Sequence, residues 1–260
     1  MMRTLMIWMA VLLIPLGAAS AARSQGAILE SMDQLKDQPM TPAFRGTLPS
    51  RVDLSATLPA VRDQGPTSTC TSWASTYAAA SQAERRAGRG QALTLSPAFT
   101  YNKIAGDRLC NGGTQLSATL DFLRDVGAVP IDEFVFDAGS CVRQPTTAEL
   151  QRAAGFRIKG WSHFNAADIN AVKGQLARGL PVLFGLATSR QFERFHGDSV
   201  FNDPNKGDGS HAMIVIGYDD ARQAFRIQNS WGRDWGDGGY AWIAYEFWKR
   251  NVTGPAYVID

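Results

Sequence analysis

The order of apolar and polar residues divides this 260-residue chain into a helical first half and a strand-rich second half. Apolar residues recur at helical spacing over residues 70–86, 117–126 and 166–178, and a glycine lies just beyond each stretch. Because glycine commonly ends a helix, this pattern predicts three helices.

Short apolar or alternating runs separated by turn residues fill the second half. They cover residues 181–186, 211–218, 224–229 and 239–243. Runs of this length are typical of antiparallel strands, and residues 219–223 provide a hairpin turn between two of them. The two halves meet near residues 154–160, so the sequence predicts an α+β fold.

The N-terminus has the pattern of a cleavable export signal. Arg3 precedes an apolar run from Leu5 to Ala18, and Ala19-Ser20-Ala21 fits a small-residue cleavage site. The run is shorter than the ~20 residues that cross a membrane. We therefore expect residues 1–21 to be removed and the protein to be secreted or periplasmic, without a membrane anchor.

Residues 22–48 are expected to form a tail in front of the folded domain. Ile28, Leu29, Met32 and Leu35 recur at helical spacing and predict a short helix. Three prolines between residues 39 and 49 then favour extended backbone.

Composition and charge limit the function. A hydrophobic content of 45% suits a packed domain. We expect this domain to span residues 49–260, with residues 49–154 mainly in a helical lobe and residues 155–260 mainly in a β lobe. The net charge of +2, from 26 basic and 24 acidic residues, is too small to hold nucleic acid or an anionic membrane. We expect a monomer.

Cys70 is the first candidate for chemistry. Ser68 or Thr69 can cap the helix that follows, which places Cys70 in its first turn. The free N–H groups there favour a thiolate over a thiol. The alternative is an inert buried cysteine, which is the common fate of a lone one.

A thiolate needs a proton acceptor, and His211 is the best placed histidine. It begins an apolar strand, and Asn229 ends the next one, 18 residues later. In an antiparallel hairpin the two side chains come together, so that the amide can orient the imidazole. Trp231 can shield that hydrogen bond from water. The other histidines, His163 and His196, lie in polar surroundings and are interpreted as surface residues.

Gln64 lies six residues before Cys70. Its side-chain amide and the Cys70 backbone N–H can together hold the oxyanion that forms during acyl transfer.

Together these residues resemble the papain-like cysteine peptidases. Gln64, Cys70, His211 and Asn229 follow the family's order, and the cysteine and histidine are 141 residues apart. Three flanking segments also resemble the family: Leu48-Pro49-x-x-Val52-Asp53, Cys110-Asn111-Gly112-Gly113 and residues 229–240. Two positions depart from it, because Thr71 replaces the usual tryptophan and Thr67 the usual cysteine.

The resemblance implies a two-lobe fold, a helical lobe packed on an antiparallel β-barrel lobe, with the active site in the cleft between them. It implies a polypeptide substrate, a Cys70 nucleophile and a His211 general acid and base. Gly112 and Gly113 would pair with extended substrate. Trp231 would also border the substrate, and the pocket for the second residue before the cut would be bordered by Thr114, Gln115, Gly185 and Gly209. No metal or organic cofactor is implied.

The resemblance also bears on the other two cysteines. Cys110 usually bonds the cysteine that is Thr67 here, and a cysteine near Cys141 usually bonds a partner that this chain also lacks. We therefore expect a Cys110–Cys141 disulfide in an exported protein. Two separate thiols are the alternative.

Two questions stay open at this level. The tail over residues 22–48 either restrains the enzyme by lying in its cleft or is disordered. The same catalytic residues would also serve an acyl transferase of transglutaminase type, and an inactive peptide-binding module is a further alternative.

Overall fold

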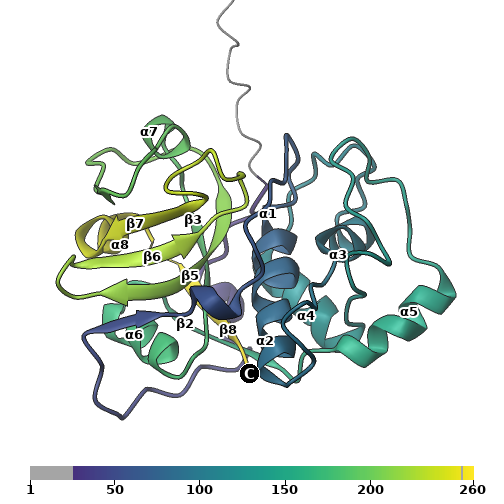
Figure 1. The fold of residues 1–260 in the computed structure, drawn as a ribbon, viewed down its shortest axis with the longest axis horizontal. Helices are drawn as coiled ribbons and strands as arrows, with labels where there is room; N and C mark the ends of the chain where they lie inside the picture. Colours follow the sequence, from purple (N-terminus) through teal and green to yellow (C-terminus); the bar gives the residue numbers. More distant parts are fainter. Residues whose placement is uncertain (1–25, 253) are drawn as a thin grey trace, which may run out of the picture.

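A computed structural model describes residues 26–252 and 254–260 of the chain. The expected export signal at residues 1–21 lies outside these residues. Figure 1 shows two lobes side by side, one built from helices α1–α5 and the other from a sheet with α6, α7 and α8. Within the described ranges, no helix is long and apolar enough to cross a membrane.

One continuous helical segment from residue 70 to residue 86 forms the centre of the helical lobe. It consists of α1 (Cys70–Ser72), η3 (Trp73–Ala80), whose turns are of the wider π type, and α2 (Ser81–Arg86). The predicted helix is confirmed. Thr69 occupies the N-cap position without a capping hydrogen bond, because its hydroxyl pairs with that of Thr67 at 2.7 Å.

The remaining helices of this lobe are α3 (Pro97–Ile104), α4 (Leu116–Asp125) and α5 (Thr147–Ala153). Of these, α3 and α4 pack against that segment, and α5 lies at the outer edge of the lobe (Figure 1). Only α4 was predicted. Short 3-10 turns occur at η2 (Ser55–Thr57) and η4 (Ala154–Phe156).

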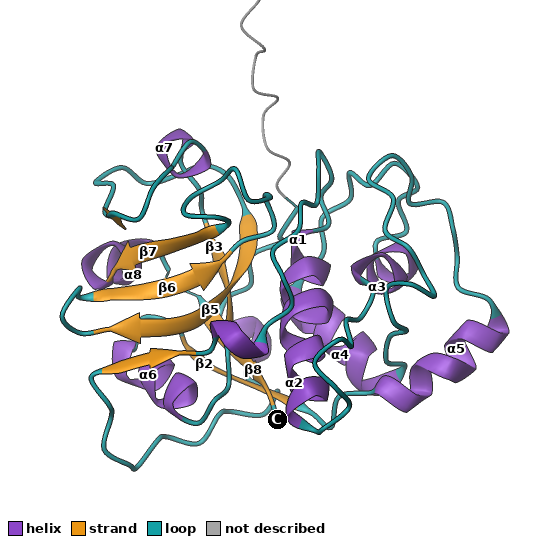
Figure 2. Ribbon diagram, viewed as in Figure 1, coloured by secondary structure: helices purple, strands orange, loops and turns teal. Residues whose placement is uncertain are grey.

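Eight strands form the sheet of the other lobe, drawn in orange in Figure 2. The strand order is β2-β8-β3-β5-β6-β7-β4, with β1 paired to β5, and only the β4–β7 pair is parallel. The strands are β1 (Arg51–Asp53), β2 (Trp161–Asn165), β3 (Val182–Leu186), β4 (Val200–Phe201), β5 (His211–Asp219), β6 (Ala224–Gln228), β7 (Tyr240–Ala244) and β8 (Pro255–Ile259). The four predicted strands are confirmed as β3, β5, β6 and β7.

Helices also cover this lobe. They are α6 (Ile169–Ala177), α7 (Arg190–Glu193) and α8 (Tyr245–Asn251). The α6 helix was predicted, and its N-cap is Asp168, whose side chain accepts from the Ala171 N–H at 3.0 Å.

Strand β5 belongs to the cores of both lobes. Ala212 and Ile214 pack in the core shared with the helical lobe, whereas Met213 and Val215 pack in the core of the β lobe. A strand buried on both faces explains the uninterrupted apolar run in the sequence. It also places His211, its first residue, at the junction of the lobes.

The first described residues of the tail, from Gly26 onwards, are extended, so the expected helix over Ile28–Leu35 is wrong. Ala27 forms a parallel bridge with Thr114, and the segment contains a single 3-10 turn, η1 (Asp33–Leu35). Pairing of its backbone with the rest of the domain satisfies N–H and C=O groups that a helix would have satisfied internally. Leu35 is buried in the core shared by the two lobes.

The expectation that His163 lies on the surface is also wrong. Its ring is fully buried, and Nδ1 lies 3.0 Å from the carbonyl oxygen of Pro39. The cause is the extended tail, which pairs with β2: the Thr41 N–H donates to the His163 carbonyl at 2.8 Å. His196 is exposed, as expected.

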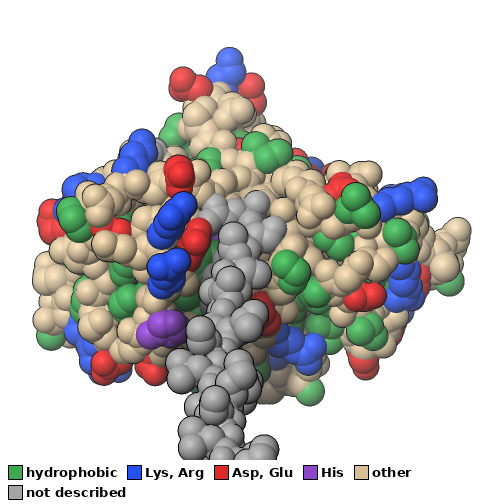
Figure 3. Space-filling view, turned by 90° about the horizontal axis from the view of Figure 1, so that it is seen from above, with side chains coloured by type: hydrophobic (Ala, Val, Ile, Leu, Met, Phe, Trp, Pro, Cys, Tyr) green, Lys and Arg blue, Asp and Glu red, His purple; other side chains and the backbone are tan. Residues whose placement is uncertain are grey.

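On the face seen in Figure 3, acidic and basic side chains are interspersed, in keeping with the small net charge.

Candidate active site

Cys70 begins α1 at the interface between the two lobes. Its side chain is fully buried and takes part in no disulfide. Burial raises the pKa of the thiol, and the backbone N–H groups of Ala212, Gly26 and Thr71 partly oppose that rise. Because Gly26 belongs to the tail and Ala212 to β5, the sulfur lies between the tail and the β lobe.

His211 and Asn229 form a hydrogen-bonded pair at the end of the sheet. His211 Nε2 lies 2.7 Å from Asn229 Oδ1, which also accepts from the Ser230 N–H at 2.8 Å. The Trp231 ring stacks on the imidazole, with ring centroids 4.2 Å apart and an interplanar angle of 24°. These contacts fix the ring and turn its Nδ1 edge away from Asn229.

Gln64 is held in a fully buried position beside the same segment. Its backbone N–H donates to the Ser230 carbonyl at 2.8 Å, and the Ser230 hydroxyl donates to Gln64 Oε1 at 2.6 Å. The Gln64 side-chain nitrogen donates to the Thr67 carbonyl at 2.6 Å. The loop before Cys70 is therefore attached to the segment that carries Asn229.

The loop containing Gly112 and Gly113 is held by a carboxylate. Asp107 accepts from the N–H groups of Leu109, Asn111 and Gly112, and these hydrogen bonds hold the pKa of Asp107 below its usual value. The Tyr101 hydroxyl donates to the Gly112 carbonyl at 2.7 Å. Both backbone groups of Gly112 are thus engaged within the protein.

The expected disulfide joins Cys110 to Cys141, with Cα atoms 5.3 Å apart. The Cys110 carbonyl also accepts from the Ser68 N–H at 2.7 Å. This hydrogen bond lies next to Thr67, where the family's usual cysteine is missing. It connects the Gly112 loop to the loop before Cys70 without a covalent bond.

The tail occupies the groove beside Cys70 as an added strand. The Thr114 N–H donates to the Gly26 carbonyl, and the Ile28 N–H donates to the Thr114 carbonyl, both at 2.9 Å. On the other side, the Ala27 N–H donates to the Ser210 carbonyl at 3.3 Å, and the Ser210 hydroxyl donates to the Ala27 carbonyl. Thr114 therefore provides the backbone partner for the tail on this side, and the expected pairing of Gly112 and Gly113 with substrate stays a prediction.

Two glycines expected in the substrate pocket lie along this groove. Leu29 lies so close to Gly185 that a side chain there would collide with it. Gly185 and Gly209 line a groove of about 630 Å³ along the tail. Gln115 takes the N-cap position of α4 and is partly exposed. Gly113 lies beside Ile28, since a Cβ at Gly113 would be 3.1 Å from that side chain.

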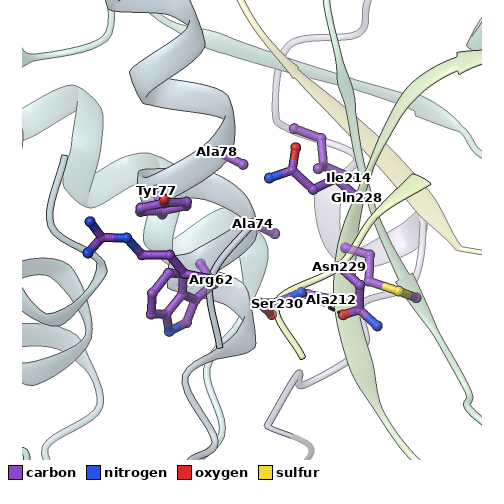
Figure 4. A pocket seen from close by; sticks show the side chains of 11 residues that line it. Arg62, Ala74, Tyr77, Ala78, Ala212, Ile214, Gln228, Asn229 and Ser230 are labelled. Carbon is purple, nitrogen blue, oxygen red and sulfur yellow. Dashed lines mark hydrogen bonds between the residues drawn. The ribbon is translucent and has the colours of Figure 1, made fainter. Parts of the chain in front are cut away.

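Behind Cys70, His211 and Asn229 the lobes are closely packed. Figure 4 shows a small cavity between η3, which carries Ala74 and Tyr77, and the strand segments with Ala212 and Asn229. Its volume is about 10 Å³, which is room for about one water molecule. A cavity of this size leaves no room for a peptide on this side of the residues.

Sequence reasoning missed several residues of this site. Asp107 could have been found from its position, because an aspartate shortly before a glycine-containing loop commonly accepts from loop N–H groups. Ser210 precedes His211 and carries no separate signal. Glu30 and its partner Tyr257 are 227 residues apart, and no local pattern connects them.

The comparisons with known proteins agree with this geometry. The sequence model of the papain family of cysteine proteases matches residues 48–254, and the chain belongs to this family. The family and the two-lobe α+β fold expected from the sequence are thereby confirmed.

Particular relatives include animal peptidases. Cathepsin K of Mus musculus is 26% identical over 223 residues, which are 82% of this chain and 64% of the relative. A cathepsin L-like peptidase of Aedes aegypti is 26% identical and covers 75% of this chain and 58% of the relative. The chain thus spans 58–64% of the length of these two proteins.

Solved structures share the fold. Xylellain, a cysteine protease from Xylella fastidiosa, superposes with a TM-score of 0.78 at 25% identity, over 92% of this chain and 96% of that one. Digestive procathepsin L 3 from the larval midgut of Tenebrio molitor superposes with a TM-score of 0.70 at 21% identity, over 92% and 76% of the two chains.

Proposed function

We propose that the protein hydrolyses peptide bonds through a thioester formed on Cys70, as an endopeptidase. The observation that carries this proposal is the His211–Asn229 hydrogen bond of 2.7 Å at the same lobe interface as the fully buried Cys70. Membership of the papain family supports it.

In the proposed mechanism the Cys70 thiolate attacks the carbonyl carbon of the scissile bond. The Gln64 amide and the Cys70 backbone N–H stabilise the oxyanion. The His211 imidazolium then protonates the leaving amine, and the C–N bond breaks to leave an acyl-enzyme. His211 next takes a proton from water, whose oxygen attacks the thioester carbon. The C–S bond breaks, which releases the carboxylic acid and restores the Cys70 thiolate beside the His211 imidazolium. Asn229 orients the imidazole throughout.

The tail supplies the proposed inhibitor of this site. It pairs with Thr114 and Ser210 beside Cys70, in the groove where substrate would bind. Substrate and tail would then compete for the same backbone groups. We further propose export from the cytoplasm, which the Cys110–Cys141 disulfide supports, since disulfides persist in oxidising compartments.

The test is hydrolysis of a peptide library by the purified protein, with Cys70→Ala as the matched control. We expect cleavage that this variant loses and a thiol-reactive peptide inhibitor that labels Cys70. Full activity in Cys70→Ala would contradict the assignment. Transfer to an added amine that exceeds hydrolysis would favour the acyl transferase, and an unlabelled Cys70 would favour the binding module.

A further inference from the structure

The tail places one carboxylate at the far end of the groove, where it bridges the two lobes. Glu30 accepts from the Ser117 N–H at 3.1 Å, from the Ser117 hydroxyl, and from the Tyr257 hydroxyl at 2.6 Å. Ser117 lies in the first turn of α4 in the helical lobe, and Tyr257 lies on β8 in the β lobe. All three donors belong to the body of the enzyme.

These donors lie next to the proposed substrate pocket. Tyr257 is 2% exposed and pairs across the sheet with Leu183. Gly185 is two residues further along β3, so it shares a sheet face with Leu183 and lies diagonally opposite Tyr257. Gly185 and Tyr257 line the same groove.

The chemistry of this end suits a carboxylate. A carboxylate accepts several hydrogen bonds and needs to donate none, whereas the NH₂ group of an amide would face donors here. Burial, together with the charge of Glu30, raises the pKa of the Tyr257 phenol, so that it remains a donor. The groove is also lined by Lys206 and Asp208, whose opposite charges offset each other.

We propose that Ser117 and Tyr257 form a specificity subsite for an acidic side chain of the substrate, a glutamate at the second residue before the cut. In the tail-covered state, Glu30 occupies this subsite in place of that side chain. The inference rests on the proposed function, because it assigns a substrate class to the same groove.

The experiment uses the full chain carrying Leu29→Gly and Glu30→Gly, which removes the tail side chains that lie against Gly185 and between Ser117 and Tyr257. Matched peptides with Glu, Gln, Leu or Lys at the second residue before the cut are compared by kcat/KM. We expect the Glu peptide to exceed the Leu and Gln peptides by about tenfold. Adding Ser117→Ala or Tyr257→Phe should bring the Glu-to-Leu ratio close to one, whereas Tyr245→Phe, a buried tyrosine bonded to Asp220, should preserve it.

Binding of the same peptides to the Cys70→Ala form, followed by fluorescence anisotropy, separates this inference from the proposed function. Tighter binding of the Glu peptide without cleavage by the Cys70 form would support the subsite and overturn the peptidase assignment. Cleavage without a preference for Glu, or a preference that survives both Ser117→Ala and Tyr257→Phe, would overturn the subsite alone.

Discussion

Replacing Glu30 with alanine should release the tail from the groove. The substitution removes hydrogen bonds to the Ser117 N–H, the Ser117 hydroxyl and the Tyr257 hydroxyl. At about 1 kcal/mol for each bond to this partly exposed carboxylate, the loss is about 3 kcal/mol. Since ~1.4 kcal/mol is a factor of ten, docking of the tail should weaken roughly 100-fold.

The assay is the initial rate of hydrolysis of a small fluorogenic peptide by the full chain. In the closed state the tail lies in the groove, and in the open state it has left the groove. Where most molecules are closed, the open fraction rises in proportion as docking of the tail weakens, until nearly all molecules are open. We therefore expect the rate of hydrolysis to rise about 10- to 100-fold. The rate of alkylation of Cys70 by iodoacetamide should rise in parallel, because it reports access to the thiol and does not require turnover.

Asp37→Ala is the matched control, since it removes an exposed carboxylate from the same tail. It should leave both rates within about twofold of the parent. If Glu30→Ala changed neither the peptidase rate nor the alkylation rate, the tail would not limit access to Cys70, and the reasoning would be refuted.

Three further predictions follow from the site. Asn229→Ala should lower kcat about 10- to 100-fold, whereas His211→Ala should abolish turnover, because only the Asn229 variant keeps the imidazole that accepts the proton. Steady-state kinetics of the two variants measures this difference. Burial raises the pKa of the Cys70 thiol in the closed state. The rate of alkylation of Cys70 should therefore keep increasing as the pH rises through and beyond the range in which ordinary thiols ionise. A rate that reaches a plateau near neutral pH would contradict this prediction. Replacing Cys110 and Cys141 with serine should lower the free energy of unfolding by about 3–4 kcal/mol, measured in guanidinium chloride.

The positions of the proposed catalytic residues were predictable because their signals are local or follow from strand pairing. Cys70 begins a helix whose period extends over 17 residues, from Cys70 to Arg86. His211 and Asn229 belong to one hairpin, so a short separation in sequence becomes a short distance in space. Neither inference required knowledge of contacts between the lobes.

Elements that depend on distant partners were missed. Strand β8 is the last in the chain, yet it lies between β2 and β3 in the sheet. Short elements such as α7, with four residues, carry too few positions for a period to emerge. The prediction of a surface position for His163 was wrong for the same reason. Its ring is buried against Pro39, which lies 124 positions earlier in the chain.

The tail was misjudged because its helical spacing is a weak local preference. A segment of eight residues forms too few internal hydrogen bonds to be a stable helix in isolation. The groove offers Ala27 and Ile28 backbone partners on Thr114 and Ser210, and it offers Glu30 three donors. Tertiary contacts therefore decide the conformation.

The attachments of the tail also decide how its role can be tested. Ala27 and Glu30 hold the part that lies in the groove, whereas Leu35 is buried in the core and Thr41 pairs with β2. Cutting the chain back to Leu48 would remove all four at once, and it would expose the core as it opens the groove. Substitutions at Leu29 and Glu30 leave Leu35 and Thr41 in place. A change in the activity of variants at Leu29 and Glu30 therefore reports inhibition by the tail. The free energy of unfolding of the same variants shows whether the substitutions have also affected the fold.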